Sequence, residues 1–158
     1  MGKFCPIIQS NTVYLSCREC EEMLCKKEYL ALLIAGTRTY KDFCEFSAIC
    51  DRVTQNYKDV IIISGGARGA DCLAEYYAKQ KRYPFIEVKA EWDRYGKRAG
   101  YIRNRKMHEM LSQNKNRGVL LFWDGKSRGT AQNIDLVKEF GTDIRIWNFE
   151  EKKFTKPT

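Results

Sequence analysis

The fold of this 158-residue chain follows from residues 60–71, which read VIIISGGARGAD. The apolar run Val60–Ile63 is typical of a buried strand. The glycine-rich segment Ser64–Asp71 comes next, and the amphipathic stretch Cys72–Arg82 begins directly after it. Strand, glycine-rich turn and helix start thus follow one another without a linker, as they do in the repeating unit of a parallel α/β sheet.

The segment Ser64–Asp71 has the features of a phosphate-binding turn. Glycine lets a ligand come close to the backbone, and the first turn of a helix leaves N–H groups unpaired at the positive end of the helix dipole. The residues expected at the ligand are Ser64, Gly65, Gly66, Gly69 and Ala70, with Asp71 accepting a hydrogen bond from a ribose hydroxyl. The spacing matches neither the G-x-G-x-x-G fingerprint nor a Walker A loop, and a turn with positive φ or a helix cap at Asp71 would select the same residues.

The same alternation of strand and helix extends over most of the chain. Apolar runs predict strands at 29–35, 60–63, 85–88, 119–123 and 144–147. Apolar residues at helical spacing predict helices at 41–57, 71–82, 99–113 and 130–140. Five short strands separated by four helices indicate an α/β fold, namely a Rossmann-like doubly wound parallel sheet with helices on both faces.

Three loops, 36–38, 64–71 and 124–130, fall at the carboxyl ends of these strands, where the ligands of such sheets bind. The third loop offers hydroxyl groups beside the free N–H groups of a helix start, although serine and threonine are also ordinary N-caps. Outside 64–71, the residues expected at the ligand from these loops are Gly36, Thr37, Arg38, Ser127, Gly129 and Thr130. We therefore expect the three loops to form one crevice.

Positive charge is concentrated in the segment 79–117, which holds twelve Lys or Arg and four Asp or Glu, whereas the rest of the chain holds sixteen of each. This excess equals the whole net charge of +8 and points to an anionic partner, either a phosphorylated small molecule or nucleic acid. Within the segment we expect Trp92 to stack on a base and Lys97 and Arg103 to meet phosphate. A solvated basic surface with its aromatic residues packed on the sheet edge would show the same pattern.

The chain divides into a Cys-rich N-terminal extension at 1–28, the regular domain at 29–149 and a loose tail at 150–158. No apolar run approaches the roughly 20 residues of a membrane span, and the first residues lack an apolar signal core. We therefore expect a cytoplasmic protein with no membrane partner. The sequence leaves open whether it forms a homo-oligomer.

Two further residue types have ordinary structural interpretations. Cys44, Cys50 and Cys72 fall in predicted helices, and free cysteine packs as a small hydrophobe, so we expect these three to fill the core. His108 is the only histidine, and it lies among charged residues in the middle of a predicted helix. We expect it on the surface.

Taken in order along the chain, several motifs resemble the SLOG superfamily, in particular its small YspA-like branch. They are Gly36-Thr37-Arg38, the loop 64–71, Glu91-Trp92 with Tyr95-Gly96-Lys97, Ala99-Gly100 with Arg103-Asn104 and Met107, and Ser127 with Gly129-Thr130. The resemblance covers about residues 30–147. It implies a Rossmann-like domain with Asn104 at the ligand, binding nucleotides or nucleotide-derived molecules that act as signals in members tied to phage defence or stress.

Two related families define the alternatives. In the lonely-guy phosphoribohydrolases, which cut the base from a nucleoside monophosphate, an Arg four residues before a Met and a Gly-Thr-x-x-Glu motif carry the chemistry. Arg103 and Met107 fit the first motif, but Asn133 stands at the position of the catalytic carboxylate. The DNA-processing protein A family, which binds single-stranded DNA, has a loop similar to 64–71. We expect a nucleotide-binding sensor module, with an N-glycosidase in which Arg103 would act and a single-stranded DNA binder as alternatives.

Four further cysteines, Cys5, Cys17, Cys20 and Cys25, lie in the first 25 residues with the spacing C-x11-C-x2-C-x4-C. Four thiolates so close together fit a closed tetrahedral zinc site, which would stabilise a segment too small to have its own core. Unliganded thiols and an iron–sulfur cluster are the alternatives. We expect structural zinc and no redox cofactor.

This expectation has a direct test. Protein purified without chelator should contain about one zinc per chain by elemental analysis, because four thiolates bind zinc tightly at neutral pH. The quadruple Cys→Ser variant at positions 5, 17, 20 and 25 should contain none. Metal-free parent protein would contradict the zinc site.

Overall fold

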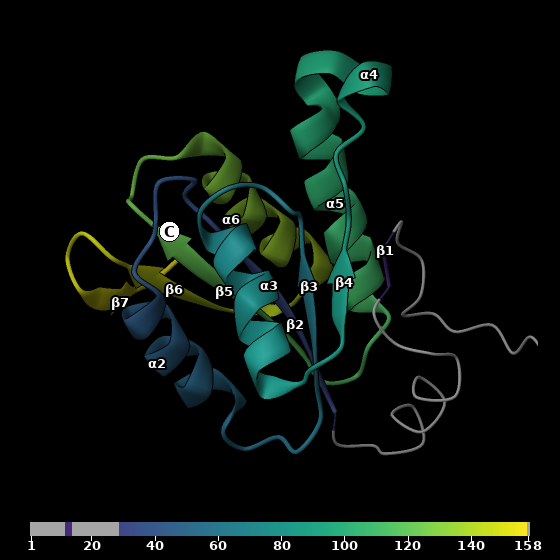
Figure 1. Cartoon of the computed structure of the whole chain (residues 1–158). Helices are drawn as coiled ribbons and strands as arrows, with labels where there is room; N and C mark the ends of the chain where they lie inside the picture. The colour runs from purple at the N-terminus through teal and green to yellow at the C-terminus, as the bar shows by residue number, and fades with distance from the viewer. Residues whose placement is uncertain (1–11, 14–28, 158) are drawn as a thin grey trace, which may run out of the picture.

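The computed structural model describes residues 12–13 and 29–157, which form a three-layer α/β/α domain (Figure 1). The strands are β1 (Thr12–Val13), β2 (Leu30–Gly36), β3 (Val60–Ser64), β4 (Phe85–Glu87), β5 (Arg117–Trp123), β6 (Asp143–Asn148) and β7 (Lys153–Thr155). The helices are α2 (Phe43–Thr54), α3 (Ala70–Lys81), α4 (Trp92–Tyr95), the 3-10 helix η1 (Gly96–Arg98), α5 (Ala99–Ser112) and α6 (Arg128–Phe140).

The strands pair in the order β1-β4-β3-β2-β5-β6-β7. The five central strands are parallel, and β1 and β7 add to the two edges in antiparallel orientation. The chain builds outward from β2 through β3 to β4, and then returns to the other side of β2 to place β5 and β6. The direction of winding therefore reverses between β2 and β5, which is where Rossmann-like sheets bind their ligands.

Each face of the sheet carries its own hydrophobic core. Along β2, Ala31, Leu33 and Ala35 face one core, and Leu30, Leu32 and Ile34 face the other, because successive side chains of a strand point to opposite faces. Helices α5 and α6 cover the first face, and α2 and α3 cover the second (Figure 1). Burial on both faces explains why the central strands are nearly continuous apolar runs.

The prediction of a Rossmann-like doubly wound parallel sheet is confirmed, and each predicted strand and helix is present within a few residues of its expected ends. The structure adds the short helices α4 and η1 between β4 and α5. It also adds β7 in the segment where we expected a loose tail. No helix in the described part of the chain is long and apolar enough to cross a membrane.

The carboxylate of Glu45, on α2, holds the β7 end of the sheet. Its Oε1 accepts hydrogen bonds from Tyr40 and from Nε1 of Trp147, each at 2.9 Å, and its Oε2 lies 2.7 Å from Nζ of Lys152. Although partial burial alone would raise the pKa of Glu45, these donors bring it below its ordinary value. The carboxylate therefore connects α2 to β6 through Trp147 and to the turn before β7 through Lys152.

Of the cysteines, Cys50 is buried as expected, but Cys44 and Cys72 are exposed, so the expectation that all three fill the core is wrong for these two. Helices α2 and α3 each cover the sheet with one face, and both exposed cysteines lie on the outer face. The proposed zinc ligands Cys5, Cys17, Cys20 and Cys25 lie outside the described residues. Within the described ranges, no cluster of three or more His, Cys, Asp or Glu could hold a metal ion.

Gly69 lets the loop between β3 and α3 pack against the loop that follows β2. Its φ is 77°, in a region that side chains disfavour, and a Cβ here would overlap the backbone carbonyl oxygen of Thr37. The position is therefore restricted to glycine by packing as well as by backbone conformation.

Gly69→Ala should lower the free energy of unfolding by about 2 to 4 kcal/mol, because it combines backbone strain with a backbone clash. Urea denaturation measures the change. Gly129→Ala is the matched control, since a Cβ there meets no atom within 4 Å and the position is helical; its stability should be unchanged or higher by up to about 1 kcal/mol. Equal stability of the two variants would contradict the packing role of Gly69.

Candidate functional site

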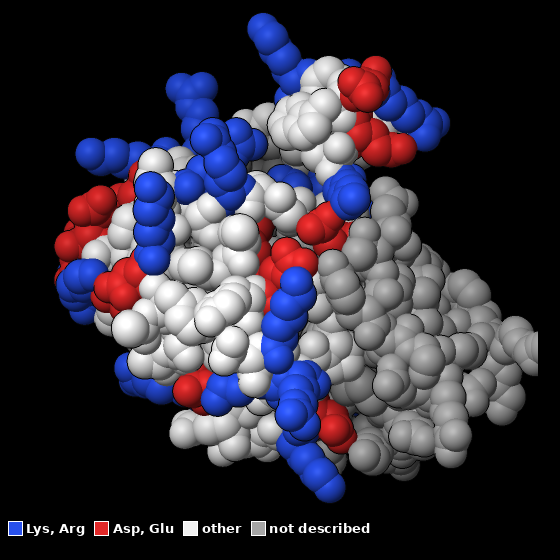
Figure 2. Space-filling view, viewed as in Figure 1, with Lys and Arg blue, Asp and Glu red and all other residues white. Residues whose placement is uncertain are grey.

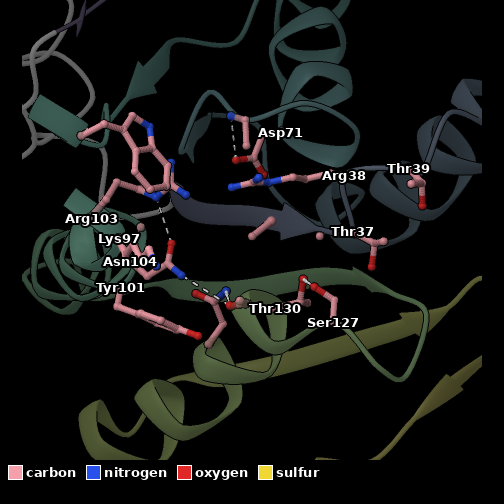
Figure 3. Close-up of a pocket in the computed structure, with 17 residues that line it drawn as sticks. Thr37, Arg38, Thr39, Asp71, Lys97, Tyr101, Arg103, Asn104, Ser127 and Thr130 are labelled. Atoms are coloured by element: carbon pink, nitrogen blue, oxygen red, sulfur yellow. Dashed lines mark hydrogen bonds between the residues drawn. The ribbon is translucent and has the colours of Figure 1, made fainter.

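A cavity of about 430 Å³ opens at the carboxyl ends of β2 and β5, where the winding of the sheet reverses. The loop after β2 supplies Arg38 and Thr37, the start of α3 supplies Asp71, α5 supplies Arg103, and α6 supplies Thr130. Figure 3 shows these side chains arranged around one open space, with Ser127 and Thr130 on the side opposite Asp71 and Arg38. The reversal thus brings together residues from four separate segments of the chain.

Arg103 is the most firmly positioned cation of the cavity. Its Nη1 donates a hydrogen bond to the carbonyl oxygen of Gly65 at 2.6 Å, and its Nε donates to Oδ1 of Asn104 at 3.0 Å. A Cβ at position 65 would overlap the guanidinium group, so glycine at this position makes room for Arg103. The glycine-rich loop therefore positions an arginine, a role that the sequence analysis did not foresee.

Asp71 is buried beside this arginine, with an exposed fraction of 5%. Its Oδ2 accepts a hydrogen bond from the backbone N–H of Ala67 at 3.1 Å, which closes the loop onto the start of α3. Burial raises the pKa of Asp71 to about 6, although the charge of Arg103 and hydrogen bonds from the loop act in the opposite direction. The N-cap of α3 is Gly69, so Asp71 does not cap the helix.

The charge of Arg103 is only partly balanced by its surroundings. Burial lowers the pKa of its guanidinium; Asp71 opposes this shift, Arg38 adds to it, and Glu87 opposes it. Two of its five N–H donors are used within the protein, by Gly65 and Asn104. The guanidinium can therefore still bind a carboxylate or phosphate oxygen without losing its support.

The wall opposite is the start of α6. Its N-cap, Ser127, makes no side-chain capping bond, and Oγ1 of Thr130 donates to Oγ of Ser127 at 3.3 Å. The N–H groups of the first helical turn have no partner within the helix, so this end attracts an anion. Asn104 links the two walls, because its amide nitrogen donates to Oε1 of Gln132 at 2.9 Å.

Asn133, which also lines the cavity, forms a buried pair with His108 behind it. Nε2 of His108 lies 2.8 Å from Oδ1 of Asn133, whose amide nitrogen donates to the carbonyl oxygen of Gly129 at 3.3 Å. The expectation of a surface histidine is wrong, because His108 is fully buried where α5 packs on α6. Burial lowers the pKa of His108; the hydrogen bond with Asn133 opposes this shift, and the charge of Arg105 adds to it.

A second hollow of about 500 Å³ adjoins the first and is lined by the loop 65–68 and by Glu87, Lys89 and Ala90. Arg38, Ala67, Trp92 and Arg103 line both hollows. Lys and Arg side chains project around the end of the molecule where α4 and α5 extend beyond the body (Figure 2). The surface around the two hollows is therefore strongly basic.

Comparison with known proteins agrees with this architecture. Residues 31–95 match the YspA, cpYpsA-related SLOG family. The chain is also 34% identical over 127 residues to the Gene 61 protein of Mycobacterium phage D29, with 77% of this chain and 97% of that protein covered. The chain belongs to the SLOG superfamily.

A solved structure shares the fold of this SLOG domain. DNA processing protein A from Helicobacter pylori, described in a study of its single-stranded DNA binding mode, superposes with a TM-score of 0.55 at 18% identity. The match covers 76% of this chain and 66% of that chain. At this identity the likeness concerns the arrangement of strands and helices alone.

Most residues that the sequence singled out in this SLOG domain line the first hollow. They are Gly36, Thr37, Arg38, Asp71, Trp92, Lys97, Arg103, Asn104, Ser127, Gly129 and Thr130. Gly65 and Gly66 line the second hollow instead. Sequence reasoning missed Ala35, Thr39, Ala67, Gly100 and Tyr101 as lining residues.

Three loop residues that we expected at the ligand, Ser64, Gly69 and Ala70, line neither hollow. Oγ of Ser64 donates to the carbonyl oxygen of Ile34 at 2.7 Å, inside the sheet. Gly69 and Ala70 are used where α3 packs on the end of β2. Their small size allows these elements to pack closely. Small residues are required in a closely packed turn as well as in a phosphate-binding loop, so the sequence alone does not distinguish the two.

The stability of this SLOG domain should depend on pH through Asp71. Between about pH 4 and pH 6 the folded protein retains a proton that the unfolded chain has lost, so the free energy of unfolding falls as pH rises. Relative to Asp71→Asn, the free energy of unfolding of the parent should fall by about 2 kcal/mol between pH 4 and pH 7. Urea denaturation across this range measures the difference, and Asp135→Asn, an exposed carboxylate on α6, is the control. Parallel curves for parent and Asp71→Asn would contradict the shifted pKa.

Proposed function

We propose that this protein binds a nucleotide or a nucleotide-derived ligand in the first hollow, as a sensor module. In this arrangement Arg103, Arg38 and Lys97 bind phosphate, together with the N–H groups at the start of α6. Asp71 accepts a hydrogen bond from a ribose hydroxyl, and Trp92 stacks on the base. The size of the hollow, about 430 Å³, lies within the range of pockets that enclose small ligands.

The observation that carries the proposal is the fixed guanidinium of Arg103 facing the free end of α6 across the hollow. An arginine held by two internal hydrogen bonds loses little conformational freedom when it binds a phosphate. The N-terminus of α6 adds a second group that favours negative charge. Asp71 lies beside Arg103, and a buried carboxylate suits a hydroxyl group better than a phosphate.

Membership of the SLOG superfamily supports a ligand of nucleotide type. The first hollow also contains Asn104, Ser127 and Thr130, which offer neutral hydrogen-bonding groups for a sugar or a base. An N-glycosidase is less well supported, because Asn133 stands where the phosphoribohydrolases have a carboxylate. Its amide is bonded to Gly129 and His108, and an amide neither takes up nor releases a proton.

Single-stranded nucleic acid is the second candidate. Trp92 on α4 and Tyr101 on α5 line the hollow and are 50% and 47% exposed. Exposed aromatic residues among cations suit successive bases of a single strand. The structural relative from Helicobacter pylori was described for its single-stranded DNA binding mode, which supports the same reading. Affinity that falls steeply with salt would favour this candidate over a nucleotide pocket.

Arg103→Ala should weaken binding of the preferred nucleoside 5′-monophosphate by about 1 to 3 kcal/mol, or roughly 5- to 150-fold in Kd, because a charge-assisted bond to phosphate is lost. A thermal-shift screen of nucleotides selects the ligand, and isothermal titration calorimetry measures Kd. The same mixtures, analysed for free base by chromatography, test for hydrolysis, which we do not expect.

Arg105→Ala is the matched control, since Arg105 lies on the same helix but is exposed and paired with Glu139 at 2.8 Å. Its Kd should equal that of the parent. Arg103→Lys keeps the charge but loses the two internal hydrogen bonds of the guanidinium, so its Kd should lie between those of the parent and of Arg103→Ala. Equal affinity of Arg103→Ala and parent would overturn the assignment of Arg103, and release of free base would show that the site is catalytic.

A further inference from the structure

The second hollow shares its boundary with the first, and the shared residues include two arginines. Arg38, Ala67, Trp92 and Arg103 line both. In Figure 3 the side chain of Arg38 extends across the site toward Arg103. A phosphate bound by these two arginines would therefore lie between the hollows.

The two hollows differ in the chemistry of their walls. Besides the shared arginines, the first contains Lys97, the buried Asp71 and neutral polar groups such as Thr130. The second contains Arg68 and Lys89, both exposed, and Glu87, whose Oε2 lies 3.8 Å from Nζ of Lys89. With Arg38 and Arg103, the second hollow has an excess of positive charge, so it also suits a part of a ligand that carries phosphate.

Size argues that one nucleotide does not fill the site. The hollows measure about 430 and 500 Å³, and each alone falls within the range that encloses a small ligand. A mononucleotide in the first hollow would leave the second hollow, with Arg68 and Lys89, unused. Trp92 lies at both hollows and presents an exposed indole on which a base can stack.

We propose that the ligand is a dinucleotide, that is, two nucleoside units joined through phosphate, with one unit in each hollow and the linking phosphate at Arg38 and Arg103. This inference rests on the proposed function, since it adds a second unit to the same ligand. A 3′–5′ phosphodiester and a 5′–5′ diphosphate share this chemistry, and the choice between them is left to the experiment.

Isothermal titration calorimetry should compare three sets of probes: the four nucleoside 5′-monophosphates, the four 5′-phosphorylated homodinucleotides with a 3′–5′ linkage, and diadenosine 5′,5′-diphosphate. At least one dinucleotide should bind 10-fold or more tightly than its mononucleotide. Arg68→Glu, which places a negative charge in the second hollow only, should weaken the dinucleotide at least 10-fold and leave the mononucleotide unchanged.

Arg98→Glu is the matched control, because Arg98 is an exposed arginine on η1 that lines neither hollow. This variant changes the net charge as much as Arg68→Glu does, and at 0.15 M salt it should bind both probes with the affinity of the parent protein. Melting temperatures verify that both variants fold. If a mononucleotide and its dinucleotide bind with equal Kd, and Arg68→Glu changes neither value, the proposal of a dinucleotide ligand is wrong and the proposed function still stands. Binding of no probe would count against both. Affinity that keeps rising with oligonucleotides longer than two units would overturn the dinucleotide in favour of a single strand.

Discussion

The reversal of winding between β2 and β5 is the constraint on which the site depends. Adjacent parallel strands whose connections leave in opposite directions have no helix crossing above their shared carboxyl ends, so a hollow remains there. In this protein the loop after β2, the starts of α3 and α6, and the middle of α5 all border that hollow. Residues from these separate segments meet at the hollow because of the strand order.

Within this frame the glycine-rich loop has a different role from the one its composition suggests. Ser64, Gly69 and Ala70 hold the loop against β2, and Gly65 makes room for Arg103. In the proposed binding of a phosphate, the loop acts mainly through the arginine that it positions. Asp71 completes the arrangement, since its carboxylate closes the loop by accepting the N–H of Ala67 and lies near the arginine in a buried environment.

The fold was accessible from the sequence because its signals are local. The runs Val60–Ile63 and Val119–Trp123 identify buried parallel strands by their apolar content, and the helices follow from periodicity. The short elements escaped prediction. Helix α4 has four residues and too little periodicity to detect, and β7 has three residues whose pairing depends on contacts of Glu45 with Trp147 and Lys152, far away in the sequence.

The sequence by itself determined the doubly wound α/β fold, the location of the ligand-binding loops at strand ends and the confinement of the excess charge to 79–117. These properties depend on neighbours along the chain. Tertiary structure alone decided which side chains meet. It placed Arg103 against Gly65, buried His108 beside Asn133, and divided the expected crevice into two hollows. The reason is that these contacts join residues 25 to 38 positions apart, and their geometry depends on how α5 packs on the sheet beside α6.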